Sequence, residues 1–190
     1  MIPPIDLSNV TLRTERLILR PWRMSDLDDL YEYASVEGVG EMAGWPHHTD
    51  KEVSRTILQN FINEKKTFAL EYEGKVIGSL GVERYAEQKY PELAGLRCRE
   101  IGYVLSRDYW GKGLMPEAVR EVIRWLFEEQ GLDAILCGHF NWNAQSARVQ
   151  EKCGFRHYGN GVYRTHMDTE EPETVNILTR EDWLAQREGA

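Results

Sequence analysis

A lysine between two glycines stands where a predicted strand passes into a predicted helix, in the segment YVLSRDYWGKGLMPEAV (residues 103–119). The first backbone N–H groups of a helix have no partner within the helix and carry the positive end of its dipole. Glycines at such a turn let the backbone approach an anion without an intervening Cβ, and Pro116 suits a first turn because its missing N–H costs little there. We therefore expect residues 110–115 to bind a pyrophosphate, with Lys112 adding a positive charge.

Two better-known glycine motifs fit this segment poorly. A Walker A loop requires Ser or Thr after its Gly-Lys pair, and here Gly113 follows Lys112. A dinucleotide-binding fingerprint requires a third glycine where Pro116 stands, and it belongs at the first βα turn rather than in the middle of the chain. On the glycines alone, an ordinary strand-to-helix turn remains the alternative.

The surrounding elements predict one α/β domain. Alternating or β-rich runs predict strands, and apolar residues at helical spacing predict helices. The predicted strands are residues 11–22, 67–74, 75–85, 98–106, 134–140, 156–167 and 173–180, and the predicted helices are residues 26–35, 51–65, 116–130 and 143–155. The resulting order, βααβββαβαββ, predicts a mixed α/β fold with a central twisted sheet flanked by helices.

Several single residues are predicted to bound these elements. Ser25 and Asn143 precede helical stretches and have the side chains that cap helix N-termini. Gly131 and Gly154 follow helical stretches and are typical of helix C-termini. The pair Glu73-Gly74 lies between two β-rich runs and predicts a tight hairpin.

Composition limits the function classes. The chain has 190 residues, 42% of them hydrophobic, and a net charge of −8, which disfavours nucleic acid as a partner. It has no linker or repeat, so we expect one domain over residues 1–190. We find neither a signal peptide nor an apolar stretch near the roughly 18 residues of a membrane helix. Its three cysteines and five histidines show no disulfide or metal spacing, so we expect a cytoplasmic protein without membrane partner or metal.

The glycine segment resembles the coenzyme A loop of the GCN5-related N-acetyltransferases, whose pattern is Q/R-x-x-G-x-G/A. The residues at these positions are Trp110, Gly111, Lys112, Gly113, Leu114 and Met115. Trp110 replaces the usual Gln or Arg and Met115 the usual small residue, and both are similar to the branch that includes the ribosomal-protein N-terminal acetyltransferases. The stretch NAQSARVQEKCGF (residues 143–155) resembles that branch's N-x-x-S-x-R-V-x-E-K-x-G-F helix. The resemblance covers residues 11 to 181 and implies this family's fold, with acetyl-CoA as co-substrate.

The resemblance also implies where the reacting groups lie. In this family the pantetheine arm pairs with the backbone of one strand, here that of Tyr103, Val104 and Leu105. The strand from Glu100 to Leu105 spans roughly 16 Å at about 3.3 Å per residue, comparable to an extended pantetheine, so the thiol end should fall near Glu100.

An attacking amine must be neutral, so a general base is needed. Glu100 is the first candidate if partial burial raises its pKa, and Glu83, at the end of the neighbouring strand, is the second. A structural ion pair of Glu100 with Arg97 or Arg99 is the alternative. An α-amine, with a pKa of about 7.7–8.0, is easier to deprotonate than a lysine at about 10.4.

The leaving thiolate needs a proton donor. Many relatives have a tyrosine just before the Glu-Lys pair of the last helix, and this chain has Gln150 there. Ser146 resembles the donor of the ribosomal-protein branch, although a small packing residue is the alternative. The resemblance also places Asn143 against the pantetheine amide and Trp45 in the wall of the acceptor site.

We therefore predict an acetyl-CoA-dependent N-acetyltransferase that moves an acetyl group to a primary amine by direct attack in a ternary complex. The acceptor is a protein N-terminal α-amine or a small amine such as a polyamine or an aminoglycoside. A non-catalytic acetyl-CoA-binding sensor is the alternative from another class, because a fold does not fix a function. The sequence leaves open the acyl chain length and the oligomeric state, including a homodimer.

Overall fold

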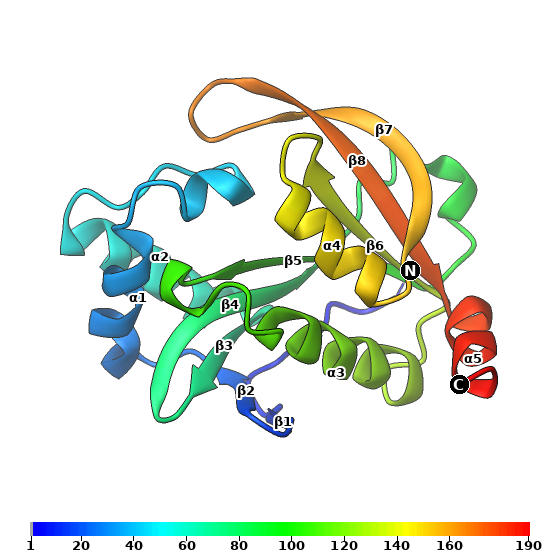
Figure 1. Cartoon of the computed structure of the whole chain (residues 1–190), viewed down its shortest axis with the longest axis horizontal. Helices are drawn as coiled ribbons and strands as arrows, with labels where there is room; N and C mark the ends of the chain where they lie inside the picture. The colour runs from blue at the N-terminus through cyan, green and yellow to red at the C-terminus, as the bar shows by residue number, and fades with distance from the viewer. Residues whose placement is uncertain (1) are drawn as a thin grey trace.

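The computed structural model describes residues 2–190 and contains one sheet with the strand order β1-β2-β3-β4-β5-β6-β8-β7 (Figure 1). Its strands are β1 (Leu12–Arg13), β2 (Leu17–Pro21), β3 (Thr67–Tyr72), β4 (Lys75–Glu83), β5 (Cys98–Leu105), β6 (Ala134–Phe140), β7 (Arg156–Arg164) and β8 (Glu170–Thr179). Its α-helices are α1 (Leu27–Ala34), α2 (Lys51–Glu64), α3 (Leu114–Glu128), α4 (Ala144–Lys152) and α5 (Arg180–Glu188). The predicted mixed α/β fold is confirmed.

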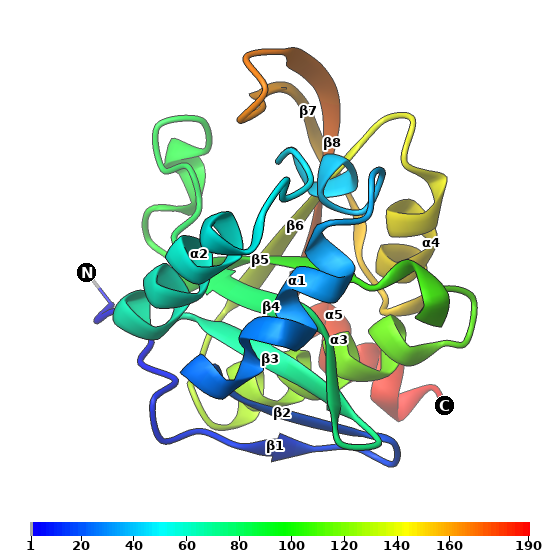
Figure 2. The same cartoon turned by 90° about the vertical axis from the view of Figure 1, so that its left-hand side faces the viewer.

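Helices cover both faces of the sheet. Figure 2 shows α1 and α2 in front of the sheet, with α3 and α5 behind it. The face of α3 holds the larger core, where Val122, Leu126 and Phe127 are fully buried together with Phe68 and Leu80 of the sheet. Burying each such side chain stabilises the fold by about 1.5–3 kcal/mol. This packing fixes α3 firmly, so its N-terminus has a defined position near the end of β5.

Short-range signals set several of the boundaries as predicted. The β3–β4 hairpin turns at Glu73 and Gly74, whose φ angles of 49° and 80° are those of a type I′ turn. After α3, Gly131 adopts a φ of 66° and Leu132 donates to the carbonyl of Leu126, which closes the helix end. The side chain of Asn143 accepts from the N–H of Ser146 and caps α4.

Two predictions about the N-terminal part were wrong. The stretch predicted as one strand over residues 11–22 is two short strands, β1 and β2, because the chain turns at residues 14–16 toward α3. Ser25 does not cap α1 with its side chain. Instead Asp26 accepts from the backbone N–H of Arg23 and from the buried guanidinium of Arg20, and residues 24–26 form a 3₁₀ turn.

The last helix was not predicted. Helix α5 follows β8 directly and is capped by the Thr179 side chain, which accepts from the N–H of Asp182. Most of its residues are polar or charged, and one side chain, that of Trp183, is buried. Trp183 packs on Phe127 of α3 with ring centroids 5.3 Å apart. Within residues 2–190, no helix combines the length and apolar composition that crossing a membrane requires.

The β5 and β6 strands part along their length, and this shapes the site. They pair in parallel from Cys98 to Ile101 on β5 and from Ala134 to Cys137 on β6, and the pairing stops there. Beyond that point β5 stays paired with β4 and β6 stays paired with β8, while β5 and β6 diverge (Figure 1). One edge of residues 102–105 therefore faces an opening rather than another strand.

Candidate functional site

A cavity of about 660 Å³ opens where β5 and β6 diverge. Many of the predicted site residues line it: Trp45, Glu83, Glu100, Tyr103, Val104, Leu105, Trp110, Met115, Asn143 and Ser146. The remaining predicted residues, Gly111, Lys112, Gly113 and Leu114, connect Trp110 to Met115 without lining the cavity themselves. The fold thus gathers residues that lie up to 101 positions apart in the sequence around one space.

The loop before α3 has the features of an anion site. No backbone partner is found for the N–H groups of Gly111 through Met115 within the described chain. Gly111 and Gly113 adopt φ angles of 75° and 74°, a left-handed conformation that non-glycine residues rarely take. The ammonium of Lys112 is exposed and lies 5.3 Å from the centre of the Tyr109 ring. Free amides, a helix dipole and a cation together suit a pyrophosphate.

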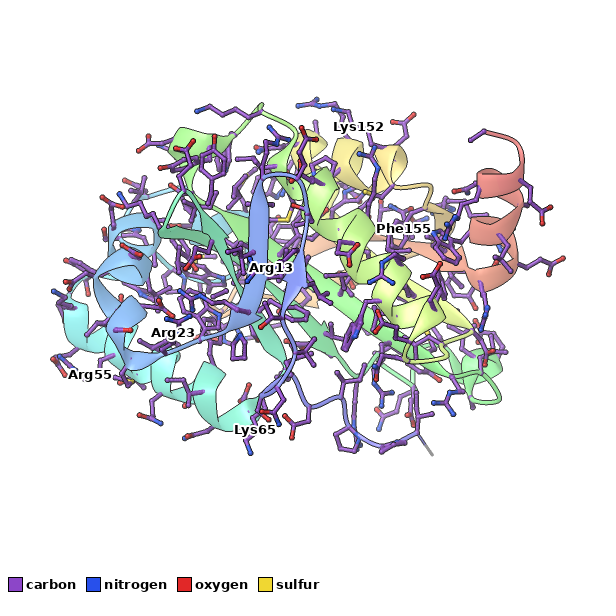
Figure 3. The ribbon with its side chains drawn as sticks, turned by 90° about the horizontal axis from the view of Figure 1, so that it is seen from below. Arg13, Arg23, Arg55, Lys65, Lys152 and Phe155 are labelled. Carbon is purple, nitrogen blue, oxygen red and sulfur yellow. The ribbon has the colours of Figure 1, made fainter. Side chains whose placement is uncertain are left out.

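Contacts from the turn between β1 and β2 hold this loop in place. The guanidinium of Arg16 donates to the carbonyl of Lys112 at 2.9 Å and to the carboxylate of Glu117 at 2.8 Å. Thr14 also donates to Glu117, in the first turn of α3. Figure 3 shows β1 and β2 lying alongside α3, with Arg13 labelled on β1. Sequence reasoning missed this contact, because no local signal links residues about 100 positions apart.

The open edge of β5 presents its own backbone groups. The N–H of Ser106 donates to Ile77 in β4, and the carbonyl of Val104 points at Gly78 of β4. Because backbone groups alternate along a strand, those of Tyr103 and Leu105 face the opening. The Leu105 carbonyl already accepts from the indole N–H of Trp110 at 2.8 Å, which ties the loop to the strand. The N–H and carbonyl of Tyr103 are left for an extended ligand.

Glu100 is the carboxylate at the inner end of the opening. It is mostly buried, and no ion pair or hydrogen bond of its side chain is found among residues 2–190. The alternative ion pairs do not form, since the guanidinium of Arg97 donates to Gln130 and that of Arg99 to the carbonyls of Cys98, Ile2 and Pro3. Burial, together with the negative charges of neighbouring glutamates, raises the pKa of Glu100 to about 7.

Two other glutamates surround Glu100. Glu83 lies directly opposite it across the β4–β5 pair, but its side chain is 56% exposed and lies 3.9 Å from the ammonium of Lys66. Glu173 on β8 was not predicted. A Cβ on Gly138 would lie 3.4 Å from a carboxylate oxygen of Glu173 and 3.9 Å from one of Glu100, so these two carboxylates flank the same glycine. Burial raises the pKa of Glu173 as well, despite Lys89 at 3.8 Å.

The opposite side of the opening is formed by α4. Ser146 lies partly exposed in the first turn, and its hydroxyl is 2.9 Å from that of Tyr103. Gln150, which replaces the tyrosine of many relatives, is fully buried. The side-chain amide of Asn143 donates to the carbonyl of Met42, which connects the cap of α4 to the loop after α1.

The side of the cavity where the sequence resemblance places the acceptor is aromatic. Trp45 lines the cavity and packs on the buried ring of His48, with ring centroids 5.2 Å apart. Phe140 and Tyr163 also line the cavity, with their ring centroids 5.7 Å apart. Residues 2–190 contain no group of three His, Cys, Asp or Glu side chains arranged to hold a metal ion. The arrangement instead suits proton transfer to a carboxylate beside an extended, anionic ligand.

Comparison with known proteins agrees with this geometry. The family model described as "Acetyltransferase (GNAT) domain" matches residues 16–156. The FsC-acetyl coenzyme A-N(2)-transacetylase of Aspergillus fumigatus is 33% identical over 59% of this chain and 49% of its own length. The ribosomal protein uS5 alanine N-acetyltransferase of Escherichia coli is 27% identical over 46% of this chain and 45% of its own length.

These two curated relatives are matched over only about half of their own length. Among solved structures, a GNAT-family acetyltransferase from Bacillus anthracis superposes with a TM-score of 0.77 at 23% identity, covering 90% of this chain and 99% of the other. At that identity the superposition supports the fold alone.

Replacing Gly113 by alanine should weaken acetyl-CoA binding. The left-handed conformation costs an alanine about 1–2 kcal/mol, so the loop would relax and its amides would lose their alignment. Gly131→Ala is the matched control, because Gly131 has a similar φ of 66° with open space around it but lies at the other end of α3. We expect both variants to lose similar stability in thermal melts, and only Gly113→Ala to lose affinity in calorimetry. Equal affinities would contradict the role of the loop.

Replacing Glu100 by glutamine should stabilise the protein at alkaline pH. Because the pKa of Glu100 is higher in the folded protein than its ordinary value, the folded state holds more protons between about pH 4.5 and 7, and stability falls as the pH rises through that range. The pKa rises from 4.5 to about 7, by about 2.5 units, and each unit corresponds to about 1.4 kcal/mol, so the variant should gain up to about 3.5 kcal/mol at pH 8 and almost nothing at pH 4. Urea denaturation measures this, with Glu15→Gln, at an exposed position in the turn between β1 and β2, as the control. A loss of stability at pH 8 would show that burial of the ionised Glu100 carboxylate does not destabilise the folded protein.

Proposed function

Because the chain belongs to the GNAT family of acetyl-CoA-dependent N-acetyltransferases, we propose that its acceptor is an α-amine at the N-terminus of a protein and that this amine attacks acetyl-CoA directly in a ternary complex. The observation that carries this proposal is the mostly buried carboxyl of Glu100, which lines the cavity and whose pKa is raised to about 7 by burial and neighbouring glutamates. Moving a proton to it from an α-amine costs about 1 kcal/mol, whereas moving one from a lysine costs about 5 kcal/mol. The name of the Escherichia coli relative, which specifies an alanine of a ribosomal protein, supports the same acceptor class.

Acetyl-CoA supplies an activated acetyl group, and residues of this chain bind and orient it. The free amides of Gly111 to Met115 and the charge of Lys112 suit its pyrophosphate. The backbone of Tyr103 suits an amide of its pantetheine arm, which would then extend along β5 toward Glu100. These are the contacts that the sequence resemblance implies, and the parting of β5 and β6 leaves room for them.

Glu100 and Ser146 then handle the protons. Glu100 accepts a proton from the ammonium form of the acceptor, directly or through water, which frees the nitrogen lone pair. As the N–C bond forms and the C–S bond breaks, the hydroxyl of Ser146 donates to the departing sulfur, whose thiol has an ordinary pKa of about 8.5. The acylated nitrogen then loses its second proton to water. No covalent acyl-enzyme is involved, since all three cysteines are buried.

A small amine is the second candidate acceptor. The carboxylates of Glu100 and Glu173 flank Gly138 near the inner end of the cavity and would attract a compact cation. The Aspergillus fumigatus relative is named as an N(2)-transacetylase of FsC, whereas the other relative is named for a protein substrate.

An acceptor panel tests the proposal directly. Coenzyme A release would be measured at pH 7 with a lysine-free peptide that has a free N-terminus, an N-terminally blocked peptide with one lysine, a polyamine and an aminoglycoside. We expect kcat/KM for the free N-terminus to exceed that for lysine by at least about a hundredfold, because a far larger fraction of the α-amine is neutral. Preference for the polyamine or aminoglycoside would establish the second candidate instead. Acetyl-CoA binding without turnover on any acceptor would indicate a sensor.

Replacing Glu173 by glutamine should shift the pH profile. The negative charge of Glu173 raises the pKa of Glu100, so its removal lowers that pKa toward its ordinary value. The base works only when ionised, so the rise of kcat/KM with pH should move to lower pH. Glu170→Gln, at the exposed start of β8, is the control and should leave the profile in place. If the profile of Glu173→Gln is unchanged, Glu100 is not the group whose ionisation makes kcat/KM rise with pH.

A further inference from the structure

Two hydroxyl groups from different elements meet at the α4 side of the cavity. The phenol oxygen of Tyr103, on β5, lies 2.9 Å from the hydroxyl oxygen of Ser146 and 3.2 Å from the Ser146 carbonyl. Both residues line the cavity. The buried amide nitrogen of Gln150 lies 3.3 Å from each of the two hydroxyl oxygens.

The orientation of the Gln150 amide follows from its other two contacts. Its nitrogen is 2.9 Å from the carbonyl of Gly138, which can only accept a hydrogen bond, so the nitrogen must donate there. Its oxygen accepts from the side-chain amide of Asn176 at 2.7 Å. One N–H of Gln150 therefore remains, and it points at the hydroxyl pair of Tyr103 and Ser146.

The direction of the hydrogen bond between the two hydroxyls decides what Ser146 can do. If Tyr103 donates to the Ser146 carbonyl, 3.2 Å away, then Ser146 donates to the Tyr103 oxygen and the Ser146 proton is used within the protein. If Tyr103 donates to Ser146, the Ser146 proton has no other acceptor among the described residues and is free to face the cavity. Burial raises the pKa of Tyr103 well above its ordinary value, so the phenol keeps its proton and remains a donor. A sulfur gaining negative charge in the cavity favours the second arrangement.

We infer that Tyr103 is a positioning residue for the acid step: it donates to the Ser146 hydroxyl oxygen and thereby directs the Ser146 proton to the departing sulfur. This inference rests on the proposed role of Ser146. The electron pair of the broken C–S bond stays on sulfur, which takes the Ser146 proton. The Ser146 oxygen, now negative, is stabilised by hydrogen bonds from Tyr103 and Gln150 until water returns a proton to it. Glu100 takes the first proton, which the ammonium loses before attack. The nitrogen loses its second proton once the N–C bond has formed, to the water that reprotonates the Ser146 oxygen.

The same arrangement keeps the proton acceptor, Glu100, apart from the proton donor, Ser146. Side chains alternate along a strand, so Glu100 and Tyr103, three residues apart on β5, point to opposite faces of the sheet. Glu100 faces Glu173, and Tyr103 faces α4. The base and the acid therefore approach the reacting atoms from opposite sides.

A double-mutant cycle of Tyr103→Phe and Ser146→Ala tests the inference. We expect Tyr103→Phe to lower kcat by about tenfold to a hundredfold, with KM for acetyl-CoA changed by less than about threefold. In the Ser146→Ala background the same substitution should add less than about a twofold further loss, because the phenol acts through the serine. Tyr85→Phe, which removes another buried phenol that does not line the cavity and packs in a separate core cluster, is the control and should keep full kcat.

Several outcomes would overturn the inference. Full kcat in Tyr103→Phe would remove any role for the phenol. Multiplying losses would mean that the two hydroxyls act independently, and a loss in Tyr103→Phe without one in Ser146→Ala would make the phenol itself the donor. Incorporation of 3-fluorotyrosine at position 103 keeps the shape and the donor, so it should retain kcat even if Tyr103→Phe folds poorly, and a loss there would also count against the inference. Failure of the proposed function is distinguishable, since the wild-type protein would then prefer another acceptor or show no acetyl transfer at all.

Discussion

The parting of β5 from β6 is the constraint on which the rest of the site depends. Buried backbone groups must find hydrogen-bond partners, and a strand edge without a neighbour presents a row of unpaired ones. Here the parallel pairing ends at Ile101 and Cys137, so the edge of β5 beyond it faces a cavity instead of a strand. An extended ligand that pairs with this edge completes the sheet locally. The α3 N-terminus lies at the outer end of the same edge, which gives the ligand a direction.

The cavity places the group that accepts a proton and the groups that donate one in different electrostatic surroundings. Burial and the neighbouring glutamates raise the pKa of Glu100 to about 7, so near neutral pH its carboxylate can take up a proton and release it again. On the other face of the sheet, three uncharged groups, from Tyr103, Ser146 and Gln150, share their protons in one cluster. A charged acid placed there would be strongly desolvated, whereas hydroxyl and amide donors stabilise a developing anion without that cost.

Much of this fold and part of the site follow from local patterns. The Glu73-Gly74 turn, the cap at Asn143 and the buried strand at residues 134–140 are set by nearest neighbours, so the sequence predicts them. The turn that splits the first strand, the Arg16 contact to the α3 loop and the position of Glu173 beside Glu100 depend on residues far apart in the chain. Such pairings arise only when the sheet is assembled, and no periodicity records them. Helix α5 was not predicted because a single residue, Trp183, anchors it to the core, and one apolar residue does not make a helical pattern.

The central claim is that acetyl-CoA lies along the open edge of β5, with its pyrophosphate at the α3 N-terminus. Amide hydrogen exchange with and without acetyl-CoA tests it most directly, because it reports on the backbone groups themselves. The account predicts slower exchange in residues 102–105 and 111–115 together, with little change in the β1–β3 strands. Protection elsewhere, or protection of the α3 loop without that of β5, would contradict it.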